Sequence, residues 1–99
     1  MKYRLSIKAE EDIELIWLWT FQNWSKEQAD RYVSQIIDEI EYLSNYPNSG
    51  KDYSHVREGY LRSKIKSHII FYKVNHDQSF IEIIRILHER MDIEERLNE

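Results

Sequence analysis

The spacing of apolar and polar positions predicts two helices in the first half of the chain. Apolar residues recur every three to four positions over 9–23, and a cleaner stripe of the same spacing covers 29–43. Ser25 can cap the second helix, with Gln28 reaching back as in a capping box, and Pro47 ends it. The joint between the two stripes is short, so we expect an antiparallel helical hairpin.

A strand precedes the first helix. Tyr3, Leu5 and Ile7 alternate with polar neighbours, which is the period of a half-buried strand. Ser6 could instead cap the first helix, and the strand would then end near Leu5.

The second half of the chain alternates turn signals with short apolar runs. Residues 47–50, Pro-Asn-Ser-Gly, are the strongest turn signal, and 51–58 form a polar loop. Weak alternation from Tyr60 to about Lys66 predicts an outer strand.

Two further strands are richer in β-branched and aromatic residues. They cover 67–74 and 80–88, joined by a tight polar connection at 75–78. Both are apolar on two faces, which is typical of central strands. Asp92 could cap a short helix that ends at Leu97.

These elements predict an α+β fold in one domain, residues 1–99. The order is β-α-α-β-β-β with a short C-terminal helix, and the helical hairpin packs on a twisted antiparallel sheet. A chain of 99 residues fits one core.

The amino-acid composition excludes several kinds of functional site. The chain has no cysteine, which excludes disulfides, thiolate metal sites and a cysteine nucleophile. It has neither an apolar run of membrane-spanning length nor the apolar segment of a signal peptide, so we expect a cytoplasmic protein.

Charge is uneven along the chain. The net charge is −4, yet residues 51–90 carry eight basic and five acidic groups. A protein that wraps duplex DNA is usually basic overall, so direct duplex binding is disfavoured. A local surface for an anion or a protein remains open.

Histidine is the commonest acid/base group and metal ligand. No pair among the four has the spacing of a helical zinc site, so we expect no metal and no cofactor. His68 and His88 are expected at opposite ends of paired strands and need not be close. His88 could be a general base beside Arg85 or Arg62. The favoured interpretation is that it fixes the strand end by bonding to the backbone or to Asp92.

Arg85 lies within the apolar strand 80–88 and must be paired or reach a surface. Glu82 is three positions away, which on a regular strand is the opposite face, so the partner must come from elsewhere. A structural ion pair, or a place at the rim of the sheet, is slightly favoured over a fork that binds a phosphate or carboxylate.

The first helix is apolar over more than one face. Leu15, Leu18 and Trp19 lie off its main stripe. Exposed apolar surface of this kind usually marks a partner groove, which an amphipathic segment could fill.

Several segments together resemble the ParE/RelE superfamily of toxins from type II toxin–antitoxin systems, and its ParE branch in particular. The resemblance rests on Leu5-Ser6, Ala9-Glu10-Glu11-Asp12-Ile13, Ile16-Trp17, Trp24, Ala29 with Tyr32, Tyr46 to Lys51, Val56 to Tyr60, Ser67 to Tyr72, and Ile84 to Asp92. It implies a cognate antitoxin, ParD-like or of another type, that wraps the toxin. Leu15, Leu18 and Trp19 would then bind the antitoxin.

The resemblance leaves two targets open. ParE-type toxins inhibit DNA gyrase, whereas RelE-type toxins cleave mRNA on the ribosome. The residues expected to contact the target are Arg57, Arg62, Arg85, His88 and Arg90. The end of the chain is acidic and would repel an RNA backbone. It also lacks tyrosine, and the pI of the whole chain is about 5.6.

We therefore expect a gyrase inhibitor that is not an enzyme. The alternative is a RelE-like endonuclease that uses Arg62, Arg85 and His88. A third hypothesis is a family member that still binds an antitoxin but is no longer toxic.

Overall fold

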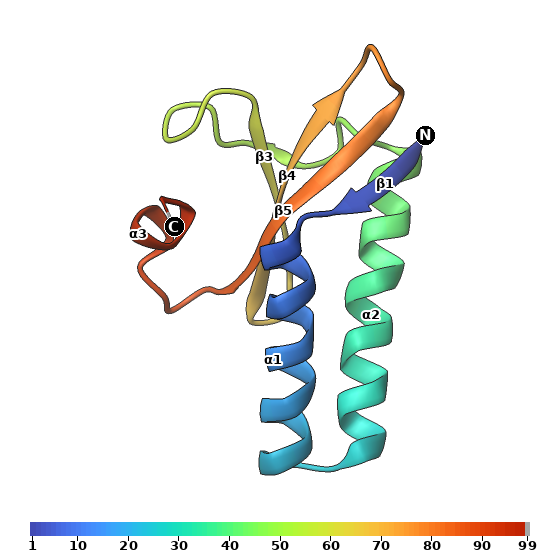
Figure 1. Ribbon diagram of the computed structural model, residues 1–99, viewed down its shortest axis with the longest axis vertical. Helices are drawn as coiled ribbons and strands as arrows, with labels where there is room; N and C mark the ends of the chain where they lie inside the picture. Colours follow the sequence, from blue (N-terminus) through green and yellow to red (C-terminus); the bar gives the residue numbers. More distant parts are fainter. Residues whose placement is uncertain (99) are drawn as a thin grey trace.

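The computed structural model describes residues 1–98 and places a helical hairpin against a five-stranded sheet (Figure 1). Its elements are β1 (Lys2–Leu5), α1 (Ile7–Asn23), α2 (Lys26–Asn45), β2 (Lys51–Asp52), β3 (Tyr60–Ile65), β4 (His68–Asn75), β5 (Phe80–His88) and α3 (Ile93–Leu97). The predicted α+β class, the hairpin and the short last helix are confirmed.

Serine caps set the starts of both long helices. The Ser6 side chain accepts a hydrogen bond from the Ala9 N–H, and the Ser25 side chain accepts one from the Gln28 N–H. Ser6 also donates to the Ile84 carbonyl at 2.7 Å, which ties the start of α1 to β5. Of the two interpretations left open for Ser6, the cap is confirmed, and β1 ends at Leu5.

The sheet is mixed, and in this respect the prediction of an antiparallel sheet was wrong. Its strand order is β1-β5-β4-β3-β2, and β1 pairs with β5 in parallel. The last strand thus lies beside the first, and alternation within β1 carries no information about such a distant partner. The predicted loop 51–58 also contributes the two-residue strand β2, so β3 is not the edge.

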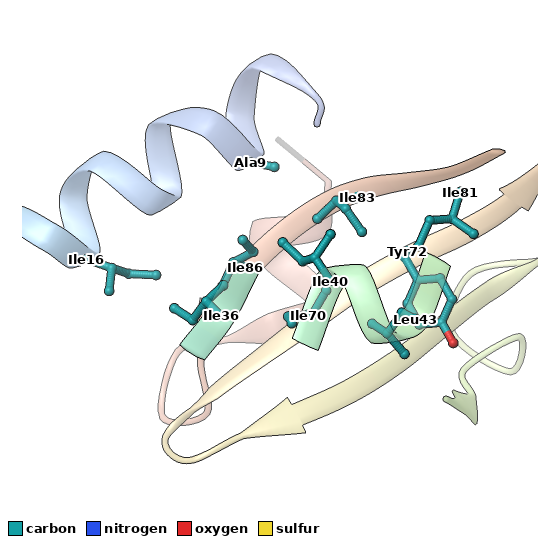
Figure 2. Close-up of a cluster of buried hydrophobic side chains, with 10 residues drawn as sticks. All are labelled: Ala9, Ile16, Ile36, Ile40, Leu43, Ile70, Tyr72, Ile81, Ile83 and Ile86. Atoms are coloured by element: carbon teal, nitrogen blue, oxygen red, sulfur yellow. The ribbon is translucent and has the colours of Figure 1, made fainter. Parts of the chain in front are cut away.

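Apolar side chains cover both faces of the sheet, as predicted for β4 and β5. The face toward α1 and α2 carries the larger cluster, in which Ile36 and Ile40 of α2 meet Ile70, Ile83 and Ile86 (Figure 2). The opposite face carries a smaller cluster: Ile69, Phe71, Leu87 and Leu97, with Tyr53, Tyr60 and Ile93 packed against it. The hairpin therefore covers one face, and α3 with the 53–59 loop covers the other.

A bulge in β5 changes which side chains share a face. Register shifts between Phe71 and Tyr72, so that Arg85 pairs with Phe71 and Ile83 with Tyr72. Glu82 pairs with Lys73, two positions from Phe71, and therefore lies on the same face as Arg85. The expectation that these two lie on opposite faces was wrong, because the bulge breaks the strand's parity.

The turn that follows α2 is fixed by one buried tyrosine. The Tyr72 hydroxyl donates to the Pro47 carbonyl at 2.8 Å and accepts from the Gly50 N–H at 3.0 Å. A Cβ on Gly50 would lie 2.3 Å from that hydroxyl oxygen.

We predict that Gly50→Ala costs about 1–3 kcal/mol, because fully buried Tyr72 cannot move away without strain. Urea unfolding measures this cost. In the Tyr72→Phe background, which removes the nearest atom, the same alanine should cost less. An equal cost in both backgrounds would contradict the proposed clash.

Candidate functional site

A groove runs between the helical hairpin and the end of the sheet. Figure 1 shows that the α1–α2 joint projects well beyond the β3–β4 turn. The space has a volume of about 1070 Å³ and is lined by residues of α1, α2, the β3–β4 turn and the end of β5. We call it the hairpin groove.

One wall of the hairpin groove is apolar and exposed. Leu15, Leu18 and Trp19 all line it, with exposed fractions of 63%, 43% and 60%. Trp24 and Met91 add further exposed apolar surface. The sequence prediction that these three α1 residues lie outside the core is confirmed, and the structure adds that they face one cavity.

Two histidines meet at the end of the sheet within this groove. His68 pairs with His88 across β4 and β5, with ring centroids 5.2 Å apart. The expectation that they need not be close was wrong. In an antiparallel pair, the first residue of one strand lies opposite the last residue of the next.

His68 and His88 are held differently. His88 Nδ1 accepts from the Arg90 N–H at 3.1 Å, which confirms the interpretation that His88 fixes the strand end through the backbone. His68 Nδ1 lies 2.5 Å from the Tyr32 hydroxyl. Burial, followed by the neighbouring His88, lowers the pKa of His68 to about 4, so the ring is neutral at neutral pH, and the ring's tautomer sets which of Nδ1 and the Tyr32 hydroxyl donates.

His68 should make stability depend on pH. Its pKa is about 4 in the folded protein and about 6.5 in the unfolded chain, where the ring is exposed to solvent, so between these values the unfolded chain binds more protons. Stability is therefore lost as pH falls below about 6.5. Because the ring is partly exposed, we expect wild type to lose only about 1 kcal/mol more than His68→Gln between neutral pH and about pH 5.

Urea unfolding of both proteins at the two pH values measures this difference. Subtracting the loss seen in the variant removes the contribution of the carboxylates, which titrate in both proteins. Equal losses in wild type and variant would show that His68 titrates normally.

Arg85 has the partner that the sequence required from elsewhere. Its Nε and Nη2 donate to the two carboxylate oxygens of Asp12 at 2.8 and 3.0 Å, and its Nη1 donates to the Arg96 carbonyl. Both side chains of the pair are buried. Of the two roles left open for Arg85, the structure shows the ion pair, and contact with a target would require this pair to open.

The structure divides the predicted target-binding residues between the two sheet faces. Arg62 pairs with Phe71, which pairs with Arg85, so both arginines lie on the α3 face. Arg57 follows Tyr53 in the loop that packs on that same face. His88 and Arg90 instead line the hairpin groove.

Sequence reasoning missed several residues of the groove. They are Arg31, Tyr32 and Gln35 of α2, with Lys66, Ser67 and His68 from the turn and the start of β4. Counting a regular antiparallel register outward from the 76–79 turn pairs His68 with Leu87, and the bulge in β5 supplies the one-residue shift that brings His68 opposite His88. Nothing in the sequence indicates that the face of α2 bearing Tyr32 meets that turn.

Side chains that could bind a metal ion were sought over the described residues. Within residues 1–98, no group of three or more histidine, aspartate or glutamate side chains is placed to hold a metal ion. No helix in that range is long and apolar enough to cross a bilayer.

Comparison with known proteins gives one consistent family. A model described as the ParE toxin of the parDE type II toxin–antitoxin system matches residues 3–93. Toxin ParE1 of Caulobacter vibrioides is 38% identical over 90 residues, 91% of each chain. Toxin ParE1 of Mycobacterium tuberculosis is 32% identical over 96 residues, 97% of each chain.

Solved structures share the fold. One from a chromosomal ParDE system of P. aeruginosa superposes with a TM-score of 0.77 at 20% identity, covering 89% of this chain and 95% of the other. One from the RelBE2 toxin–antitoxin complex of Mycobacterium tuberculosis gives 0.67 at 18% identity, covering 88% and 95%.

Proposed function

The chain belongs to the ParE family of toxins from type II toxin–antitoxin systems, and on that premise we propose that it inhibits DNA gyrase and that a cognate antitoxin neutralises it. One observation carries the antitoxin part of the proposal. The apolar wall of the hairpin groove is exposed to solvent. In a chain with 32% charged residues, an exposed apolar patch of this kind indicates a surface that a partner covers. An antitoxin segment that covers Leu15, Leu18 and Trp19 would remove this surface from water.

We propose that the protein acts by binding and not by catalysis. The residues of the nuclease alternative, Arg62, Arg85 and His88, are divided between the two faces of the sheet. Arg85 is also engaged with Asp12. A shared reaction centre would need these groups together. The acidic segment that follows β5, with Glu94 and Glu95, further disfavours an RNA backbone.

Gyrase inhibition is tested with the purified protein. We expect it to inhibit supercoiling by purified gyrase at micromolar concentration and to accumulate gyrase–DNA cleavage complexes. Antitoxin added first should prevent both effects. No inhibition and no cleavage complex would refute the gyrase proposal.

The mRNA endonuclease remains a second candidate because of Tyr32, His68 and His88. Two adjacent imidazoles and a hydroxyl are groups that acid–base cleavage of RNA can use. Ribosome-bound mRNA that is cleaved by wild type, but not by His88→Ala, would favour this function over gyrase inhibition.

A further inference from the structure

Acidic and basic residues are separated between the helices and the sheet. The helices α1 and α2 hold nine acidic and three basic residues, whereas the five strands hold two acidic and seven basic residues. A chain of net charge −4 therefore has an acidic layer and a basic layer. Such a separation produces a field that orients the molecule toward a charged partner.

The strand register places all seven strand cations on the α3 face, which is the sheet face opposite the hairpin. Tyr3 and Leu5 pack in the cluster beneath the hairpin, so their neighbours Lys2 and Arg4 point the other way. The cations of β2, β3, β4 and β5 share a face with Phe71 by pairing or by alternation along the strand, and Phe71 belongs to the cluster on the α3 face. The alternation that builds the core thus also collects the cations.

Most of these cations are not neutralised within the described part of the chain. Two have carboxylate partners, since Lys64 pairs with Glu89 and Arg85 pairs with Asp12. The other five make no ion pair within residues 1–98, and they are Lys2, Arg4, Lys51, Arg62 and Lys73. Four of these five side chains are exposed, the exception being the half-buried Arg62.

Aromatic rings hold three of the unpaired cations in place. The distances to the ring centroids are 4.0 Å for Arg4 over Phe80, 5.6 Å for Arg62 over Tyr53 and 5.8 Å for Lys73 over Tyr60. A ring restrains a cation without cancelling its charge. These three side chains are therefore positioned and remain able to bind an anion.

The cross-strand pairs also leave the positive charge uncompensated. Lys51 lies directly opposite Arg62 in the β2–β3 pair, and like charges in this position repel. Glu82 lies opposite both Arg4 and Lys73, but within residues 1–98 neither cation makes an ion pair with it. An external anion at this face would relieve the repulsion between the opposed cations.

The spread of the cations favours a long polyanion over a small anion. They lie on strands from β1 at one edge to β2 at the other, and five strands about 4.8 Å apart span about 19 Å. Each strand of duplex DNA carries one phosphate about every 3.4 Å along the axis, so several phosphates fit within this span. A single phosphate ion would reach only neighbouring cations.

We propose that the α3 face binds the phosphate backbone of duplex DNA, and that the toxin contacts in this way the DNA that gyrase holds. This rests on the proposed gyrase inhibition and adds a DNA contact to the inhibited complex. The acidic hairpin points away from the DNA and, with the net charge of −4, keeps the affinity for free duplex low at physiological salt. DNA held by gyrase is already at high local concentration, so a weak contact is sufficient there.

Binding of a labelled short duplex to the full chain tests the DNA site without gyrase. At an ionic strength of about 0.01 M, we expect a Kd on the order of 10⁻⁵ M. The plot of log K against log salt should have a slope of about −3 to −4.5, because each phosphate contact contributes about −0.9. No duplex binding at low salt, tighter binding of oligouridine than of duplex, or equal binding of polyglutamate would overturn the proposal.

Matched variants locate the contact. Arg4→Gln combined with Lys73→Gln should weaken duplex binding about tenfold or more and reduce the magnitude of the slope by about 1.8. Lys2→Gln combined with Lys51→Gln removes two exposed cations that have no ring contact, and it should act in the same way even if the first pair of changes disturbs folding. Lys26→Gln combined with Lys66→Gln removes the same charge away from the α3 face, and an equal effect of this control would contradict a local site.

The gyrase assay separates this proposal from the proposed function. Arg4→Gln with Lys73→Gln should need about tenfold more protein than wild type to accumulate gyrase–DNA cleavage complexes. Duplex binding that depends on these cations, without any gyrase inhibition by wild type, would support the DNA site and refute the gyrase target. Gyrase inhibition that both α3-face variants leave unchanged would keep the gyrase target and overturn the DNA contact.

Discussion

Replacing Asp12 with alanine is expected to destabilise the protein by about 3–5 kcal/mol. Asp12 is 8% exposed and accepts three hydrogen bonds, from Nε and Nη2 of Arg85 and from the Ile86 N–H at 2.9 Å. Alanine removes the carboxylate that faces a buried guanidinium and leaves the Ile86 N–H without this acceptor. Urea unfolding of the purified protein measures the loss.

Two further variants show whether the buried charge is the cause. Arg85→Met added to Asp12→Ala should restore part of the stability, since it removes the uncompensated cation. Lys64→Ala breaks the exposed pair with Glu89 and should cost no more than about 1 kcal/mol. If Asp12→Ala costs no more than Lys64→Ala, the buried pair does not stabilise the junction of α1 with β5.

Replacing Trp19 with alanine should weaken antitoxin binding by about 30-fold or more, equivalent to about 2 kcal/mol. Trp19 presents a large apolar surface at the wall of the hairpin groove, and buried tryptophans are frequent anchors of interfaces. Because the ring is exposed in the free protein, stability should change by less than about 0.5 kcal/mol. Calorimetric titration with the antitoxin measures the affinity.

Tyr46→Ala is the matched control. Tyr46 and Trp19 are both 60% exposed, and Tyr46, the residue after α2, packs against Tyr42 and does not line the groove. We expect its substitution to leave the affinity unchanged. Equal affinities of wild type and Trp19→Ala would place the antitoxin elsewhere on the toxin.

Local chemistry explains which elements could be predicted. Ser6, Ser25 and Asp92 cap helices as expected, since a cap bonds a backbone N–H only three residues away. β5 has the predicted bounds, Phe80–His88, because its apolar run is long and its flanks are polar. Features that depend on near neighbours in the chain are therefore recoverable from the pattern.

Features that depend on distant segments were not recoverable. The contact between Asp12 and β5 is one of them: α1 passes beside β5 beyond the end of β1, and there Asp12 accepts from the Ile86 N–H. The parallel β1–β5 pairing is equally distant in the chain. The pairing of Arg85 with a residue 73 positions away has no local signature.

The candidate site was predicted in part for the same reason. Leu15, Leu18 and Trp19 stand out because they break the stripe of a single helix. The cationic side of the groove is assembled from α2, a turn and the end of β5, and it becomes visible only when these segments are brought together. The sequence showed an excess of basic residues over 51–90 but not which of them share a face.

The most direct test of the account is hydrogen–deuterium exchange of the toxin with and without the proposed antitoxin. We predict slower exchange in α1 around Leu15 to Trp19 and in the 66–68 turn, with no change in the 53–59 loop on the other face. Unchanged exchange in α1, together with protection of the 53–59 loop, would contradict the claim that the hairpin groove holds the antitoxin.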